Sequence, residues 1–127
     1  MKKQNADHYI FEVIFNKIPG EIEEIEYWID TGRKALKAGD FEILAEKFHK
    51  FEPHGLSGVW LLGESHLSVH SWPEEKIVFI DLFSCGDHIQ AENAYKHLLQ
   101  LLTKIGGKAQ NVKKLTRGFC FEKENGE

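Results

Sequence analysis

The chain lacks several features that would place it in a particular class of protein. Its 127 residues contain no continuous apolar run approaching the ~20 residues that a membrane-spanning helix needs. The N-terminal stretch MKKQNADHYIF carries two lysines but no apolar segment long enough for a secretory signal peptide. We therefore expect a protein without membrane segments that works in the cytoplasm.

The chain also has few cysteines and no excess of positive charge. There are two cysteines, Cys85 and Cys120, and without a secretory signal we expect both to be free thiols. Phosphate binding needs a basic face, so the net charge of -4 argues against nucleic acid as a partner. The length, with 42% apolar and 28% charged residues, fits one globular domain over 1–127 without repeats or linkers.

Hydrophobic periodicity predicts an α+β fold. Helices are expected over 21–39 and 91–107, the second with an apolar stripe of Ala94, Leu98, Leu101 and Ile105. Strands are expected over 8–15, 41–51, 57–63, 65–72, 75–85 and 109–121, although the pattern of 41–51 also permits a helix. The runs between 57 and 85 are separated by short breaks and predict an antiparallel meander. One mainly antiparallel sheet with two helices on one face makes a two-layer α/β sandwich. The last residues, 122–127, are expected to fray.

The predicted strand over 65–72 has an unusual polar face. Side chains alternate across a strand, so Leu67 and Val69 point one way, whereas the polar and aromatic residues between them point the other way. That second set is His66, Ser68, His70 and Trp72. If the helices cover the Leu67 face, the polar face is exposed either to solvent or to another protein. A second copy of the chain is the simplest partner, because two-fold dimers are the commonest oligomers.

Spacing alone leaves the chemistry open. A metal site of His66, His70, Cys85 and His88 is disfavoured, because residues four apart on a strand lie roughly 13 Å from each other. We therefore expect no metal. Ser65 with His70 could form a hydrolase pair, but the G-x-S-x-G elbow is missing. Cys85 with a histidine could form a thiol nucleophile pair, and a buried inert thiol is equally compatible. The glycines match no phosphate-binding fingerprint.

Three sequence motifs are more specific than the spacing of single residues. The segment FEPHGLSGVWLLGESHLSVHSWPEEKIVFIDLFSCGDH, residues 51–88, contains three ordered motifs: F-x-P-x-G-x-S-G-V, E-S-H-L-S-x-H-S-W-P-E and D-x-F-S-C-G. In this it resembles the short prokaryotic S-adenosylmethionine decarboxylases, which use a covalent pyruvoyl group. The resemblance implies two-layer protomers that pair sheet to sheet into an αββα homodimer, with active sites at the interface.

The resemblance also implies that the chain cuts itself between Glu64 and Ser65. The Ser65 hydroxyl would attack the preceding carbonyl, and β-elimination and hydrolysis would leave a pyruvoyl group at the start of the second fragment. The products would be a β chain, 1–64, and an α chain, 65–127. Residues matching Ser57 and His70 serve this processing in the family, and Thr or Cys at position 65 would keep a nucleophile.

The implied reaction is decarboxylation of S-adenosylmethionine to an aminopropyl donor for spermidine synthesis. The substrate amine condenses with the ketone, which accepts electrons when carbon dioxide leaves. Cys85 matches the cysteine that returns a proton to the substrate carbon. Phe51 matches an adenine-stacking aromatic, Trp72 lines the site, and Glu74 matches the residue that binds the ribose hydroxyls.

Two other functions remain compatible with the same motifs. Some relatives use the pyruvoyl machinery to decarboxylate arginine or another basic amino acid. The chain could also be an unprocessed, non-enzymatic homologue. Its N-terminus departs from many relatives, which begin with a Gly-x-His strand and an acidic, cysteine-containing turn. Here Asp7-His8 and Phe15-Asn16 stand instead.

Overall fold

The computed structural model describes residues 5–118, which form six strands and two α-helices. The strands are β1 (Asn5–Ile14), β2 (Ala45–Lys50), β3 (Leu56–Leu61), β4 (His66–Trp72), β5 (Ile77–Ser84) and β6 (Lys108–Gly118). The helices are α1 (Ile25–Ala38) and α2 (His88–Lys104), with short 3-10 turns η1 (Gly20–Glu23) and η2 (Pro73–Glu75). Cys120, the predicted strand end at 119–121 and the tail 122–127 lie outside the described residues.

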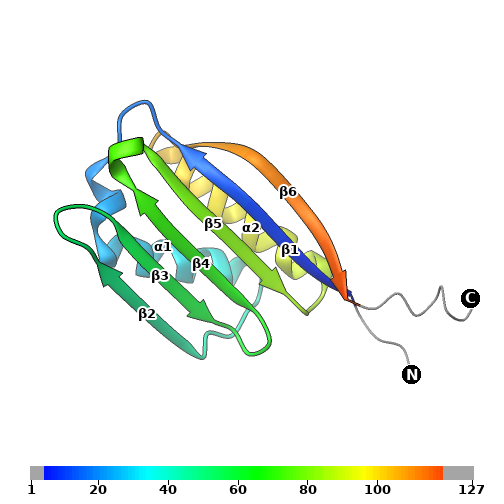
Figure 1. The fold of residues 1–127 in the computed structure, drawn as a ribbon. Helices are drawn as coiled ribbons and strands as arrows, with labels where there is room; N and C mark the ends of the chain where they lie inside the picture. Colours follow the sequence, from blue (N-terminus) through cyan, green and yellow to red (C-terminus); the bar gives the residue numbers. More distant parts are fainter. Residues whose placement is uncertain (1–4, 119–127) are drawn as a thin grey trace, which may run out of the picture.

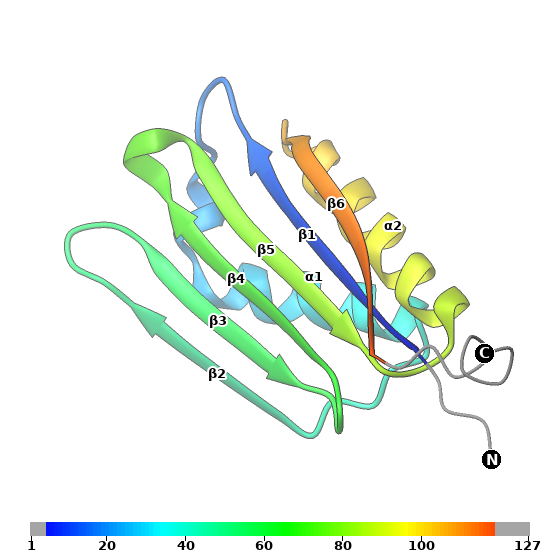
Figure 2. The same ribbon diagram turned by 45° about the vertical axis from the view of Figure 1, so that its right-hand side comes forward.

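All six strands form one antiparallel sheet in the order β2-β3-β4-β5-β1-β6. Both helices lie on the same face of this sheet, and the opposite face is bare (Figures 1 and 2). The predicted α+β two-layer architecture and the β3-β4-β5 meander are confirmed. The segment 41–51 contains a strand, β2, as favoured from its alternation. Among the described helices, none combines the length and the hydropathy needed to cross a bilayer.

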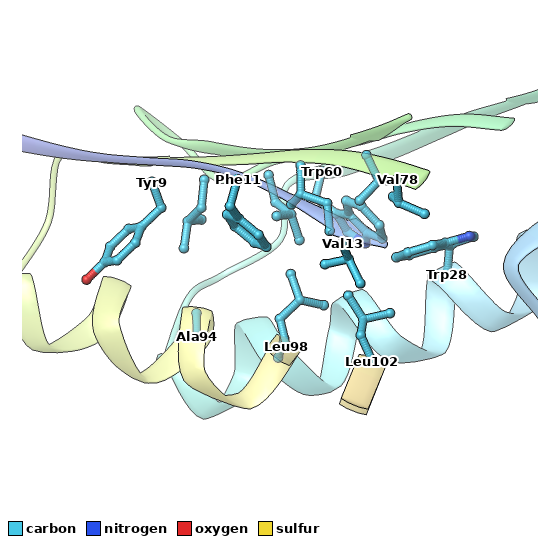
Figure 3. Close-up of a cluster of buried hydrophobic side chains, with 14 of the residues drawn as sticks. Tyr9, Phe11, Val13, Trp28, Trp60, Val78, Ala94, Leu98 and Leu102 are labelled. Carbon is cyan, nitrogen blue, oxygen red and sulfur yellow. The ribbon is translucent and has the colours of Figure 1, made fainter. Parts of the chain in front are cut away.

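The core lies between the sheet and the helices (Figure 3). Trp28 from α1 and Trp60 from β3 are completely buried there, beside Leu98 and Leu102 from α2. Leu67 and Val69 of β4 also point into this layer, whereas His70 and Trp72 are exposed on the bare face. The alternation predicted for this strand is confirmed, and it fixes which side chains remain available for chemistry.

Three predicted helix boundaries were wrong. The end of α2 is Lys104 rather than residue 107, because the chain turns at Ile105 and Gly106. The other two are the helix starts, and local hydrogen bonds explain both. The helix α2 begins at His88 rather than 91, because Asp87 caps it and Gln90 completes a capping box. The helix α1 begins at Ile25 rather than 21, since the preceding residues form η1, whose Ile22 carbonyl accepts a hydrogen bond from the Trp28 indole at 2.9 Å.

The buried stripe of α2 also differs by one position from the prediction. Ala94 and Leu98 are buried as expected, but Leu102 is buried and Leu101 only half-buried. A run of leucines makes neighbouring positions indistinguishable by hydrophobicity, so only packing against the sheet decides which one faces inward.

A close approach of α1 to the sheet makes Gly32 a sensitive position. A Cβ added there would lie 2.2 Å from a ring carbon of the buried Trp60. We expect Gly32→Ala to destabilise the fold by about 1–3 kcal/mol, since the rigid indole cannot move away without disturbing the core. Chemical denaturation measures this. Gly20→Ala, at a site with no atom within 4 Å, is the control and should change the unfolding free energy little.

Candidate active site

Ser65 lies at the end of the tight turn that joins β3 to β4. The Leu62 amide donates a hydrogen bond to the Ser65 carbonyl at 2.9 Å, which leaves Gly63 and Glu64 as the two central residues of the turn. Gly63 has φ of 81°, and glycine with positive φ suits the first central position of a hairpin turn. The Ser65 side chain is only 7% exposed. The peptide between Glu64 and Ser65 is therefore held in a defined geometry at one end of the sheet.

Cys85 contacts both residues of that peptide from the loop between β5 and α2. Its backbone N–H donates to the Ser65 hydroxyl oxygen at 3.0 Å. Its thiol lies 3.4 Å from the Glu64 carbonyl oxygen, in position to donate a hydrogen bond to it. A donor on the Glu64 carbonyl oxygen can stabilise the negative charge that develops there when the Ser65 hydroxyl attacks, and the Cys85 N–H holds the hydroxyl oxygen in place.

A second group of predicted residues forms a pocket at the other end of β4. Its volume is about 250 Å³, and it is lined by Phe51, Ser57, His70, Trp72 and Glu74, together with His54, Gly55 and Ser71. The aromatic walls are open to solvent, with Phe51 47% and Trp72 52% exposed. The Ser57 hydroxyl lies 2.8 Å from the His70 ring, so the two residues form one hydrogen-bonded pair. The pocket thus combines aromatic surface with a carboxylate.

The structure does not bring these two groups together within one chain. Ser65 and His70 are five positions apart along extended chain, a distance of roughly 16 Å. Figure 1 shows the β3–β4 turn at the opposite end of the sheet from the β2–β3 and β4–β5 turns that border the pocket. We call the two groups the Ser65 end and the Phe51 pocket. Neither Ser57 nor His70, the residues predicted to serve processing, is beside Ser65 of the same chain.

The bare face between the two groups is partly apolar. A shallow groove of about 590 Å³ runs over β2, β3 and β4 and includes Ser57, Leu61, His66, Ser68 and His70 in its lining. Exposed apolar side chains lie in the groove and elsewhere on the bare face; these are Ile10, Val59, Leu61, Trp72, Phe79 and Leu115. A face of this kind usually marks an interface.

A carboxylate in the middle of the bare face organises a cluster beside the Ser65 end. Asp81 accepts hydrogen bonds from His8 at 2.7 Å, from His66 at 3.0 Å and from the Ser68 hydroxyl. Burial alone would raise the pKa of Asp81, but these three hydrogen bonds outweigh it and hold the pKa below its ordinary value. The cluster therefore keeps a fixed negative charge next to the strand that follows Ser65.

Among the residues that the structure describes, this cluster has the ligand atoms whose distances best suit a metal site. The ligand atoms of His8, His66 and Asp81 lie within 4.8 Å of one another. However, the guanidinium of Arg117 contacts Nδ1 of His8 at 3.1 Å and can only donate there. A neutral His8 must then carry its proton on Nε2, pointing at Asp81, so this nitrogen has no lone pair for a metal. Hydrogen bonding accounts for the cluster without an ion.

Comparison with known proteins identifies the family. A sequence model of the family described as S-adenosylmethionine decarboxylase matches residues 8–118. The chain belongs to the S-adenosylmethionine decarboxylase family. This confirms the resemblance drawn from the three motifs.

Curated relatives and a solved structure agree with this membership. The S-adenosylmethionine decarboxylase proenzyme of Clostridium botulinum is 37% identical over 98 residues, covering 77% of this chain and 82% of the relative. The proenzyme of Pyrococcus furiosus is 40% identical over 86 residues, covering 68% and 60%. The crystal structure of the adenosylmethionine decarboxylase from Aquifex aeolicus superposes with a TM-score of 0.76 at 25% identity, covering 94% and 95%.

Spacing along the sequence missed two polar arrangements that the fold creates. His8 and Asp81 are 73 residues apart and meet because β1 pairs with β5. His54, which lines the Phe51 pocket, lies 3.1 Å from Glu23 of η1. The signal for Asp81 was present, as a lone carboxylate inside the apolar run IVFIDLF, but no pattern in the sequence named its partners.

Proposed function

We propose that this chain is a pyruvoyl-dependent S-adenosylmethionine decarboxylase that matures by cutting itself between Glu64 and Ser65. The observation that carries the proposal is the contact of Cys85 with both residues of that peptide. The printed names of the relatives, which are proenzymes of this decarboxylase, support the same conclusion. A buried hydroxyl held beside a polarised carbonyl is the arrangement that formation of a pyruvoyl group requires.

The self-cleavage uses only groups of the chain and one water. The Ser65 hydroxyl oxygen attacks the Glu64 carbonyl carbon while its proton passes to a base, and the peptide C–N bond breaks to leave an ester and a free amine. Removal of the Ser65 Cα proton then breaks the Cβ–oxygen bond and releases Glu64 as a carboxylate. Hydrolysis of the remaining enamine, by way of its imine, takes up water and expels ammonia. The thiol of Cys85 lies where the carbonyl oxygen needs a donor during the attack, and the Cys85 backbone N–H positions the hydroxyl.

The Phe51 pocket, called the nucleoside pocket from here on, is suited to the substrate's adenosine. An exposed aromatic ring such as Phe51 can stack on adenine, and the Glu74 carboxylate can accept hydrogen bonds from the two ribose hydroxyls. Trp72 closes one side. The pyruvoyl group supplies an electron-withdrawing ketone that accepts the electron pair as carbon dioxide leaves.

Cys85 is placed to return a proton at the reacting carbon. A thiol carries a proton that it can transfer, so it can act as a general acid. The side chain is half-buried beside residue 65, where the substrate amine would be attached. A reducing compartment such as the cytoplasm, which we propose for this protein, keeps this thiol available.

We also propose that two copies pair through their bare faces and complete each other's active sites. The Ser65 end and the nucleoside pocket lie at opposite ends of β4, roughly 16 Å apart. The two-fold axis would lie between the two sheets and run across the strands at the middle of the face. Rotation about it places one copy over the other with its strands reversed end for end. Each Ser65 then lies over the partner's pocket, and the partner's copies of Ser57 and His70 become its processing residues.

A face-to-face pair also accounts for the surface chemistry of the bare face. In a two-fold pair the same patch meets itself, so a patch with apolar flanks and a polar centre is self-complementary. The apolar flanks include Ile10, Val59 and Phe79, each about 40% exposed in a single chain. The resulting arrangement is an αββα sandwich with a helix layer on each outer side.

Carbon dioxide release from carboxyl-labelled substrates tests the proposed reaction. We expect release from S-adenosylmethionine and none above background from arginine or other basic amino acids, because Phe51 can stack on adenine and Glu74 can accept hydrogen bonds from both ribose hydroxyls. Release from arginine alone would instead assign the chain to the related amino-acid decarboxylases. Release from neither, by fully cleaved protein, would contradict both assignments.

Replacing Cys85 separates its two roles. Alanine keeps the backbone N–H that holds Ser65, so we expect Cys85→Ala to cleave itself still, at a reduced rate. Turnover should fall about 10²- to 10⁴-fold, because the proton donor is lost. Intact mass measures cleavage and carbon dioxide release measures turnover. Unchanged turnover in fully cleaved Cys85→Ala would remove the thiol from the reaction.

A further inference from the structure

A hydrogen-bonded pair behind the Ser65 end, formed by the buried Asp7 and the exposed His88, is used by no step described so far. Asp7, in β1, is 2% exposed, and one of its carboxylate oxygens lies 2.5 Å from Nδ1 of His88. The other oxygen is buried and has no hydrogen-bond partner among the described residues. A buried, half-satisfied carboxylate is costly, so its presence calls for an explanation.

The position of His88 supplies the explanation. It is the first residue of α2 and follows directly on the loop Cys85-Gly86-Asp87. Its imidazole is hydrogen-bonded to the Asp7 carboxylate, and the 17-residue helix that starts at His88 brings its positive end to the same region, which favours a negative charge there. The other end of the loop begins at Ser84, which lies opposite Asp7 in the β1–β5 register. Asp7 therefore connects His88, at the end of the loop, to β1, which pairs with β5 at Ser84, where the loop begins.

The loop held in this way is the one that presents Cys85 to residue 65. The Ser84 hydroxyl accepts a hydrogen bond from the Gly86 amide at 3.2 Å, which fixes the near end of the loop. At the middle, Cys85 makes its two contacts with Glu64 and Ser65. Displacement of a reacting group by about 1 Å can cost a factor of up to about 100 in rate, so the anchoring of this loop matters for proton transfer.

We propose that Asp7 and His88 form a clasp that holds the 84–88 loop against β1 and thereby positions Cys85 for its reaction at residue 65. Both are positioning residues, because neither contacts the reacting atoms. The inference rests on the proposed function for its kinetic consequence, but the clasp itself is a property of the uncleaved chain.

Three substitutions test the clasp. Asp7→Asn removes the charge and keeps the shape, and His88→Ala removes the partner at a site that is 64% exposed and tolerates truncation. His88→Asn restores a donor close to the position of Nδ1 and is the rescue variant. Glu46→Gln is the matched control, since it breaks another pair between two elements, Arg33–Glu46, far from the loop.

In cleaved enzyme we expect Asp7→Asn and His88→Ala to lower kcat about tenfold and to change KM less than twofold. The pocket that binds the nucleoside lies at the other end of the sheet, so binding should be preserved. His88→Asn should recover most of kcat, and Glu46→Gln should leave both constants unchanged. Values of kcat within twofold of the parent for both clasp variants would overturn the proposal.

A second readout needs no activity. In the uncleaved Ser65→Ala background, we expect iodoacetamide to alkylate Cys85 at least threefold faster when Asp7→Asn or His88→Ala is added, with peptide mass mapping to separate Cys85 from Cys120. Equal rates with and without the clasp, or the same increase in Glu46→Gln, would refute it. If the wild-type chain proves never to cleave, the proposed function fails, whereas this alkylation comparison still decides the clasp.

Discussion

Ser65→Ala is expected to remain a single intact polypeptide with decarboxylase activity at background. Alanine has no oxygen to attack the Glu64 carbonyl, so neither the ester nor the ketone can form. The change is small and removes a hydroxyl whose recorded partner is the Cys85 amide, so the fold should persist. Denaturing electrophoresis and intact mass measure cleavage, and carbon dioxide release measures activity.

Ser65→Thr and Ser65→Cys are the matched controls. Both keep a nucleophile at the same position, and we expect both to cleave, more slowly than wild type. Cysteine should start cleavage more readily than threonine, because the extra methyl of threonine must fit a side-chain site that is only 7% exposed in the wild type. Complete cleavage of Ser65→Ala at the 64–65 bond would show that another group makes the cut.

Mixing two inactive variants is expected to restore activity. Ser65→Ala lacks the nucleophile, and His70→Ala lacks the processing residue, so each homodimer should stay uncleaved. In a mixed dimer the intact Ser65 of one copy meets the intact His70 of the other, and one of the two sites works. Random pairing makes half of the dimers mixed, so co-production should yield about a quarter of wild-type activity.

The distribution of cleavage in the mixture gives the control. Only the His70→Ala chains carry Ser65, so only they should appear as two fragments, and the Ser65→Ala chains should stay whole. Differently tagged copies, purified in two steps, isolate the mixed dimers. If isolated mixed dimers remain entirely uncleaved, the two groups do not act across a subunit interface.

The sequence predicted the sheet and the helix layer because each depends on a local, periodic signal. The alternation in β4 sets Leu67 inward and His70 outward in any sheet that has one covered face. The start of α2 was missed because its first turn is polar and depends on the Asp87–Gln90 capping box rather than on a hydrophobic stripe. Helix ends are decided by such side-chain hydrogen bonds, which periodicity does not detect.

The candidate site could be named from the sequence, but its layout could not. Motifs identify Ser65, His70 and Cys85 by type and order, yet order along the chain does not show that Cys85 lies beside Ser65 while His70 lies at the far end of the strand. The Asp7–His88 pair joins residues 81 positions apart. Contacts of this kind arise from strand pairing and helix docking, so they appear only once the fold is known.

The intact mass of freshly purified wild-type protein tests the central claim most directly. The account predicts two fragments, 1–64 and 65–127, which together contain one water more and one ammonia less than the uncut chain. The second fragment should begin with a ketone that borohydride reduces. A single uncut polypeptide of 14.6 kDa that persists under native conditions, with no reducible carbonyl, would contradict it.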